Sequence, residues 1–282
     1  MIDLHTHSDV SDGSDPPARI AELAAEAGCG AVAVTDHDSL AGIGPARRRA
    51  RELGVNLIPG CEVSCQSAGT GGMHVLVYFV EDDDSPFGLE LVRLREDRRR
   101  RNLALTDRLI SLGIPLTYDM VVTEAGGESG VGRPHFASVM VAVGAADSVD
   151  DAFDRYLTNR RPGFVPKARL SAADVARLAR ESGGVAVLAH PYSMGLEGPD
   201  LARAVGELAD AGFVGIEATY GRYSSRQRQE LGNLARRFSL VPTGGSDYHG
   251  VIKPDLRVGT GQGDLKVPDR VLAELEARRS AA

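Results

Sequence analysis

Every histidine of the 282-residue chain lies in a short motif, and most of these motifs also carry Asp, Glu or Gly. The seven are His5 and His7 in DLHTHSDVSDG, His37 in TDHDS, His74 in GMHVLV, His135 in GRPHF, His190 in LAHPY and His249 in GSDYHG. Histidine is the commonest metal ligand, because a neutral imidazole nitrogen binds divalent ions near neutral pH. One such histidine is more often structural, but seven of seven, several beside a carboxylate, predict a multinuclear metal site.

Two of the motifs place a pair of ligand-type side chains two residues apart. His5 and His7 on a strand would project to the same face, and Asp247 and His249 repeat this spacing near the other end of the chain. The other motifs add further imidazoles and carboxylates, so that nine side chains are candidate ligands: His5, His7, Asp12, His37, Glu62, His74, His135, Asp247 and His249. These are too many for one ion. They predict three divalent ions, with one or two carboxylates bridging.

The ligand types indicate both the metals and the reaction. Mixed nitrogen and oxygen ligation suits Mn²⁺, Fe²⁺ or Zn²⁺ better than Mg²⁺ or Ca²⁺. Ions about 3.5–4 Å apart lower the pKa of a bridging water and stabilise both the attacking and the leaving oxygen. Three such ions against three carboxylates leave net positive charge, which attracts phosphate. We therefore expect hydrolysis of a phosphate ester by attack of a metal-bound hydroxide.

Three further residues are candidates for contacts with substrate. His190 is the histidine outside the ligand set, and we expect it to contact the phosphate or protonate the leaving oxygen; the alternative is a buried histidine oriented by a backbone carbonyl. Arg133 precedes the His135 motif, and guanidinium groups bind phosphate in a bidentate manner; a solvated arginine at a helix start is the alternative. Lys167 is a weaker phosphate candidate, and a second substrate phosphate would give both cations a target.

The elements that must position these residues alternate between apolar runs and helical patterns, as in repeated βα units. The predicted strands are Met1–Leu4, Ala31–Val34, Asn56–Ile58, His74–Val80, Gly184–Ala189, Val214–Glu217 and Leu240–Thr243. Nearly every strand is followed by a polar motif. This arrangement favours a (β/α) barrel, whose active site lies at the strand carboxyl ends, over an open sheet, where such motifs would gather at one switch point.

Helical patterns follow most of the strands and fill one long gap between them. Helices are predicted over residues 16–27, 171–182, 200–211, 224–238 and 268–279. Residues 62–65 and 73–80 form a predicted strand pair with a turn at 69–72. The chain from about residue 87 to 160 contains four predicted helices, at 87–112, 118–124, 135–143 and 150–157. We expect one domain over residues 1–282 with this helical stretch as an insertion.

Composition excludes several other classes of protein. Aromatic residues are only 5% of the chain and Trp is absent, so stacking platforms for single-stranded nucleic acid are poorly supplied. No apolar stretch approaches the roughly 20 residues that span a bilayer, and we expect no membrane partner. The start of the chain lacks a secretory signal, and three cysteines are too few for a disulfide framework. The predicted compartment is the cytoplasm. The net charge of −7 argues against broad binding to nucleic acids.

Taken in order, HTHSDVSDG, TDHD, GCE, His74, RPH, AHP and GSDYH resemble the motifs of the PHP (polymerase and histidinol phosphatase) superfamily, over roughly residues 1–255. The resemblance implies a distorted (β/α)7 barrel with a trinuclear site. It assigns His5, His7, Glu62 and Asp247 to one ion and makes Glu62 a bridge to a second. The second ion would be held by His74 and His135, and the third by Asp12, His37 and His249.

The TrpH-like (YciV-like) branch of this superfamily is the most similar in length and in the helical insertion. The resemblance implies a 3′,5′-nucleoside bisphosphate phosphatase or a 5′→3′ exonuclease acting on short RNA or DNA ends. Asp at position 12 fits this branch and counts against a histidinol-phosphate phosphatase, which is the alternative within the enzymes. A non-catalytic, nucleotide-binding module is the alternative outside them, although such modules usually lose ligands.

Overall fold

The computed structural model describes residues 1–66, 72–81, 83–128 and 130–280, and the chain divides into two compact units. The first unit comprises Met1–Leu91 and Arg169–Ala282, and the second comprises Val92–Ala168. Most of the predicted turn at 69–72 lies outside the described residues. Over the described part of the chain, no helix is both long and apolar enough to cross a membrane.

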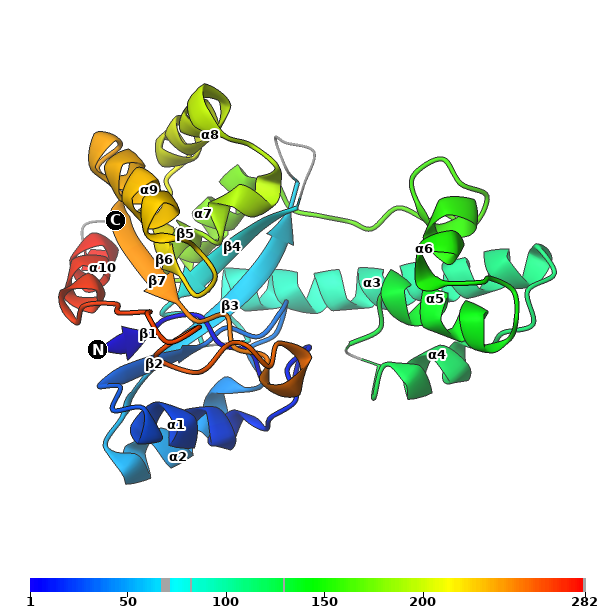
Figure 1. The fold of residues 1–282 in the computed structure, drawn as a ribbon, viewed down its shortest axis with the longest axis horizontal. Helices are drawn as coiled ribbons and strands as arrows, with labels where there is room; N and C mark the ends of the chain where they lie inside the picture. The colour runs from blue at the N-terminus through cyan, green and yellow to red at the C-terminus, as the bar shows by residue number, and fades with distance from the viewer. Residues whose placement is uncertain (67–71, 82, 129, 281–282) are drawn as a thin grey trace. The chain divides into compact units, whose positions relative to one another are not determined.

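The first unit is built around a single sheet that, in the described chain, has seven strands in sequential order. The strands are β1 (Ile2–Asp3), β2 (Ala31–Val34), β3 (Asn56–Cys65), β4 (Met73–Tyr78), β5 (Val185–Leu188), β6 (Gly215–Tyr220) and β7 (Val241–Gly245). All neighbours are parallel except β4, which runs antiparallel to both β3 and β5. The Leu4 N–H donates to the Gly244 carbonyl at 3.2 Å and brings the first and last strands together. The result is the nearly closed barrel that the sequence predicts (Figure 1).

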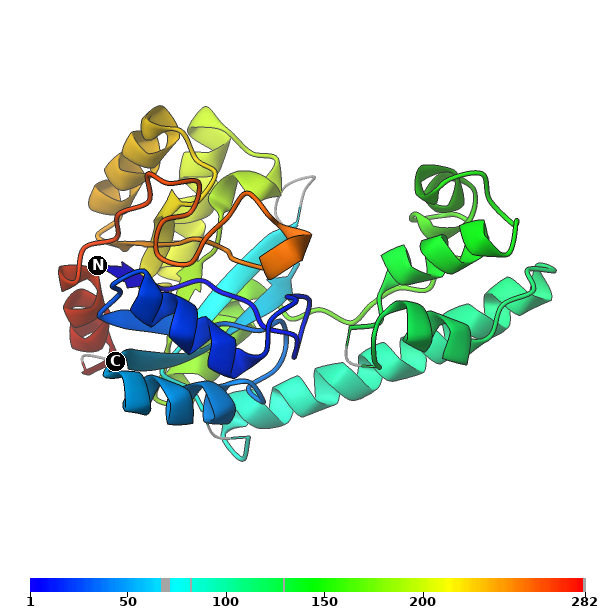
Figure 2. The same ribbon diagram turned by 60° about the horizontal axis from the view of Figure 1, so that its bottom comes forward.

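Helices cover the outside of this sheet (Figures 1 and 2). They are α1 (Pro17–Glu26), α2 (Ile43–Leu53), α7 (Ala172–Glu181), α8 (Gly198–Asp210), α9 (Ser225–Arg237) and α10 (Arg270–Ser280), with short 3-10 turns η2 (Pro191–Met194) and η3 (Gly250–Ile252). The sequence patterns predict all of the long helices except α2. The residue before that helix, Gly42, provides no side-chain cap, and the first turn contains a proline, so the start of the helix has the composition of a loop.

Alternating apolar side chains fill the interior of the barrel. Ile2 and Leu4, Ala31 and Ala33, and Val185 and Val187 belong to one buried cluster, as two-residue spacing on a strand requires. Tyr78 lies among them, and its hydroxyl donates to the Leu4 carbonyl at 2.7 Å. Apolar side chains thus fill the interior of the barrel. The polar residues that follow the strands lie instead beyond it, at the carboxyl ends of these strands.

The second unit, Val92–Ala168, is helical in its described residues. An insertion over about residues 87–160 stays a prediction. Its elements are most of α3 (Pro86–Ser111), which begins in the first unit, α4 (Tyr118–Glu124), α5 (Arg133–Ala142), α6 (Val149–Ala152) and the π-helical turn η1 (Phe153–Leu157). The unit has its own apolar core, which includes Leu105, Leu109, Phe136 and Met140. The organisation of the whole chain as one domain stays a prediction.

Candidate metal centre

The two residue pairs with i, i+2 spacing lie side by side. His5 and His7 follow β1, Asp247 and His249 follow β7, and the Asp247 N–H donates to the His5 carbonyl at 2.8 Å. All four side chains are buried. Closure of the barrel therefore brings together ligand-type residues that are about 240 positions apart in the sequence.

Glu62 on β3 is the residue on which the surrounding histidines converge, and its carboxylate is buried. Its Oε2 lies 3.1 Å from Nε2 of His5 and 3.0 Å from Nε2 of His7. Oδ1 of Asp247 lies 3.5 Å from each of these two imidazole nitrogens. His5, His7, Glu62 and Asp247 thus form one group whose ligand atoms all lie within 4.8 Å of one another.

The other oxygen of Glu62 faces a second set of imidazoles. Oε1 lies 2.9 Å from Nδ1 of His74 and 2.9 Å from Nε2 of His190. His37 approaches the first oxygen, with Nδ1 3.5 Å from Oε2, and His37, Glu62 and His74 form a second group of converging ligand atoms. Glu62 is therefore placed to bridge two ions.

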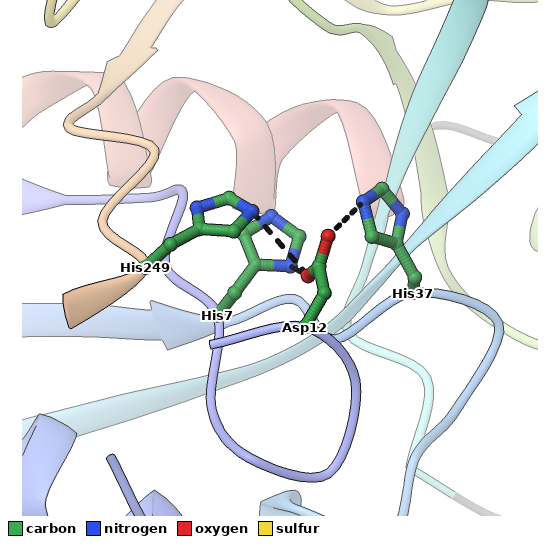
Figure 3. A group of neighbouring side chains, drawn as sticks. All are labelled: His7, Asp12, His37 and His249. Carbon is green, nitrogen blue, oxygen red and sulfur yellow. Dashed lines mark ion pairs between the residues drawn. The ribbon is translucent and has the colours of Figure 1, made fainter. Parts of the chain in front are cut away.

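Asp12 organises a third group, which Figure 3 shows with its ion pairs. Oδ1 lies 3.3 Å from Nε2 of His249 and 3.6 Å from Nδ1 of His7, and Oδ2 lies 3.6 Å from Nε2 of His37. Asp12 stands on the loop after His7 and is 52% exposed, whereas His7 and His249 are buried. This group shares His7 with the first and His37 with the second.

These donors fit divalent ions of the type that the sequence predicts. Nδ1 of His7 and Nδ1 of His37 are buried and have no hydrogen-bond partner within the described residues. Such buried nitrogens are costly unless another group satisfies them. Imidazoles with carboxylates, and no thiol within the three groups, match the donor set of Mn²⁺, Fe²⁺ or Zn²⁺. The number and identity of the ions stay predictions.

The electrostatics of the site keep the carboxylates ionised. Burial alone would raise the pKa of Glu62, Asp12 and Asp247, but the imidazoles around them lower it below the usual range of a carboxyl group. Desolvation lowers the pKa of His37 to about 4 and also lowers that of His7. At neutral pH these two imidazoles are therefore neutral, as metal ligation requires.

Glu217 on β6 holds two of the histidines, although the sequence patterns do not indicate it as a functional residue. Nδ1 of His5 donates to Oε1 at 3.0 Å, and the backbone N–H of His190 donates to Oε2 at 2.7 Å. The first bond leaves Nε2 of His5 directed at Glu62, and the second supports a backbone with a φ of +23° at His190. The only available signal was a charged residue within an otherwise apolar strand that is buried on both faces.

Asp247 is held in a comparable way by two residues that the sequence patterns also miss. The Tyr220 hydroxyl donates to Oδ2 at 2.7 Å, and Nζ of Lys253 lies 2.5 Å from the same oxygen. Oδ1 is left facing His5 and His7. Asp247 itself has a φ of +56°, a conformation that non-glycine residues adopt at local cost. These contacts keep it in that conformation.

The structure brings together eight of the nine predicted ligands, and His190 in addition. His135 is absent from the groups formed by the described residues. It lies on α5 in the second unit, where the Gly132 N–H donates to its Nδ1 at 3.1 Å and caps the helix. Its assignment as a ligand stays a prediction.

Arg133 and Lys167, the predicted phosphate-binding residues, both belong to the second unit. Arg133 donates to the Leu157 carbonyl at 3.1 Å, and its guanidinium lies within 6 Å of the ring centroids of Phe153 and Phe164. This environment orients the guanidinium through cation–π contacts. The roles of both residues toward substrate stay predictions.

A cavity of about 430 Å³ opens over the ligand groups. Its lining combines ligand-type residues with tyrosines and residues of η3: Asp12, His37, Glu62, His74, His190, Tyr192, Ser193, Tyr220, Tyr223, Asp247, His249, Ile252 and Lys253. This volume is within the range of small-molecule sites, about 300–1,000 Å³.

Comparison with known proteins agrees with the fold and with the site. Residues 3–110 match the PHP domain family. The chain is 34% identical over 252 residues to the 5′-3′ exoribonuclease Rnm of Escherichia coli, covering 88% of this chain and 85% of the relative. It is 30% identical over 277 residues to a 3′,5′-nucleoside bisphosphate phosphatase of Chromobacterium violaceum, covering 98% and 97%.

A crystal structure from Bifidobacterium adolescentis, assigned to the metal-dependent phosphoesterases, superimposes with a TM-score of 0.78 at 29% identity, and the match covers 98% of this chain and 96% of that one. Two of these matches cover 98% of this chain, and the names of all three proteins describe enzymes that cleave phosphate esters. The chain therefore belongs to the PHP family and is a phosphoesterase, a hydrolase of phosphate esters.

Proposed function

We propose that the chain uses three divalent ions, Mn²⁺, Fe²⁺ or Zn²⁺, to hydrolyse phosphate esters of nucleotides. The substrates would be 3′,5′-nucleoside bisphosphates or short oligonucleotide 5′ ends, as the names of two relatives suggest. The observation that carries the proposal is the convergence of three ligand groups on Glu62, His7 and His37 beneath one cavity.

The proposed ligand set has His190 where the sequence suggests His135. Nε2 of His190 is as close to Oε1 of Glu62 as Nδ1 of His74 is, so an ion beside that oxygen would find both imidazoles. Bound ions would supply an activated water and stabilise the charge that develops on the phosphoryl oxygens. The protein would orient the ligands, through Glu217 for His5 and through Tyr220 and Lys253 for Asp247.

Three cationic side chains are proposed to recognise substrate phosphates. Among the described residues that line the cavity, Lys253 is the only lysine or arginine. It would place positive charge beside the ions. Arg133 and Lys167 of the second unit are proposed to bind a second phosphate, because the cation–π contacts of Arg133 orient its guanidinium. A loss of activity in Arg133→Ala that is equal for mono- and bisphosphate substrates would argue against this second role.

The test measures phosphate release by the Mn²⁺-loaded chain from adenosine 3′,5′-bisphosphate, 5′-AMP and histidinol phosphate. We expect the bisphosphate to be preferred. Glu62→Gln should abolish turnover and Asp9→Asn, an exposed acidic residue on the same loop as Asp12, should not. Equal or better hydrolysis of histidinol phosphate would contradict the proposed substrate. Absence of hydrolysis of all three compounds and of a short 5′-phosphorylated oligonucleotide, with metal bound, would contradict the proposed function and favour a nucleotide-binding module without catalysis.

A further inference from the structure

The cavity over the metal centre has an aromatic wall. The chain contains seven tyrosines, and three of them line this cavity: Tyr192, Tyr220 and Tyr223. They come from η2, from the end of β6 and from the segment after β6. Although aromatic residues are scarce in the chain as a whole, they are concentrated beside the ligand groups.

The rings form a continuous series that starts at the metal ligands. The His190 ring lies edge-to-face on Tyr220 at a centroid distance of 5.6 Å, Tyr220 lies 4.8 Å from Tyr223, and Tyr223 lies 5.1 Å from Tyr192 at an interplanar angle of 80°. These are favourable geometries for aromatic pairs. Tyr220 and Tyr223 are buried, whereas Tyr192 is only half-buried and ends the series.

Hydrogen bonds hold Tyr192 in this place. Its backbone N–H donates to the Tyr223 hydroxyl at 3.1 Å, and its own hydroxyl donates to Oε2 of Glu230 at 2.9 Å. The ring is therefore oriented before any ligand arrives, which reduces the entropy lost on binding.

An exposed aliphatic residue lines the same cavity. Ile252 on η3 is 63% exposed, and its neighbour Lys253 pairs with Asp247 at the metal centre. The remaining described lining is largely imidazole, carboxylate, hydroxyl and ammonium. The apolar surface of the cavity is thus concentrated on Ile252 and the tyrosines, while the ligand groups make the rest of the lining ionic.

We propose that Tyr192 and Ile252 form a subsite for the nucleobase of the substrate. This inference rests on the proposed function, because the ester must lie at the ligand groups for its base to reach this wall. A nucleotide has an anionic phosphate and a planar aromatic base, and the cavity offers a complement to each. A sugar phosphate without a base would leave the ring of Tyr192 uncovered. Tyr192 and Ile252 therefore determine specificity for nucleotides over simpler phosphate esters.

The first experiment compares the selectivity of variants of the full, Mn²⁺-loaded chain. The readout is the ratio of kcat/KM for adenosine 3′,5′-bisphosphate to that for ribose 5-phosphate. We expect Tyr192→Ala to lower this ratio about tenfold, mainly through KM, as expected when one stacked base loses its partner. Tyr192→Phe, which keeps the ring, should retain the ratio. Ile252→Ala should lower it, whereas Val251→Ala is the matched control, since Val251 is 76% exposed on the same turn but does not line the cavity.

A second measurement separates the subsite from the reaction. Binding of adenosine, which has no phosphate, is measured by calorimetry on the same proteins without turnover. We expect Tyr192→Ala to weaken it about tenfold. One result would support the subsite and contradict the proposed function: no phosphate ester is hydrolysed, but adenosine binds and Tyr192→Ala lowers the affinity for adenosine. If nucleotides are hydrolysed while neither Tyr192→Ala nor Ile252→Ala changes the ratio or the binding of adenosine, the subsite is refuted.

Discussion

Glu217 shows how a residue outside the ligand groups can determine their geometry. One carboxylate oxygen accepts from the His5 imidazole and the other from the His190 backbone, and these two histidines contact opposite oxygens of Glu62. When a metal-bound histidine donates its second ring N–H to a carboxylate, that hydrogen bond fixes the tautomer of the imidazole and raises the basicity of the imidazole. Glu217 can do this for His5 and can hold the strained backbone of His190 at the same time.

We predict that Glu217→Gln weakens metal binding about 10- to 100-fold. Glutamine has only one acceptor oxygen, so its amide N–H₂ would face either the His5 Nδ1–H or the His190 N–H, and one of these donors would lose its partner. Metal content after dialysis against buffered Mn²⁺ measures the effect. Glu207→Gln on the exposed side of α8 is the control. Metal affinity equal to that of the wild type in Glu217→Gln would exclude this positioning role.

A second prediction concerns the two histidines proposed for the same ligand position. We expect His190→Ala to lose part of the bound metal, because its imidazole lies 2.9 Å from Glu62. His135→Ala should keep its metal and should instead weaken the start of α5, where the imidazole accepts from the Gly132 N–H. Metal analysis of both purified variants decides between them. Metal loss in His135→Ala alone would restore the assignment that the sequence suggests.

The same two residues show which features of the site a local sequence motif cannot predict. Ligand-type side chains are recognisable because few other roles place His and Asp together after strands, so eight members of the three groups could be identified. A motif does not reveal the direction in which its side chain points, so the sequence motifs alone do not decide between His135 and His190 as the ligand beside His74. Glu217, Tyr220 and Lys253 act through contacts between distant segments, which no local pattern records.

At the scale of elements, two glycines of β7 allow the barrel to close. A Cβ on Gly245 would lie 2.4 Å from Cβ of His5 and 2.5 Å from its backbone nitrogen, and a Cβ on Gly244 would lie 2.4 Å from the Thr219 carbonyl oxygen. Only the absence of side chains lets β7 pack this closely against the segments that carry His5 and Thr219. The segment after β7, which carries Asp247, is thereby aligned with the segment after β1, which carries His5.

We expect Gly245→Ala to destabilise the fold by about 1–3 kcal/mol, the usual cost of overpacking a core. Urea unfolding followed by circular dichroism measures the change. The control is Gly232→Ala within α9, where the nearest atom to an added Cβ is 4.0 Å away and the gain in helix propensity should stabilise the protein by about 0.5–1 kcal/mol. Equal stability of the two variants would contradict the close-packing argument.

Element types could be predicted from the sequence more fully than element lengths. Apolar runs and capping residues locate every strand and most helices. The sequence predicts one strand that ends at Ile58 and a separate strand over residues 62–65, yet β3 is continuous from Asn56 to Cys65. Antiparallel pairing of Gly60–Cys65 with Met73–Tyr78 supplies the hydrogen bonds that carry the strand on. Tertiary pairing of this kind overrides local propensity.

At the scale of the whole molecule, we expect the stability of the folded state to depend on metal binding at the ligand groups. We predict that Mn²⁺ raises the melting temperature and that a chelator lowers it, because ions that bind only the native state stabilise it by about 2.7 kcal/mol at a hundredfold excess over Kd. For a chain of this size the shift should be about 5 °C or more. Differential scanning calorimetry measures it. Glu62→Gln, which removes the charge shared by two ligand groups, should largely abolish the shift, and an undiminished shift in that variant would place the ions elsewhere.

The bond between the loops after β1 and β7 has a consequence for protein synthesis. His5 and His7 leave the ribosome about 240 residues before Asp247 and His249. A nascent or prematurely terminated chain thus holds, at best, an incomplete set of donors around Glu62. High-affinity binding at the two groups that include Asp247 or His249 must follow translation of these residues, so ion binding at these two groups requires that the chain has been made beyond β7.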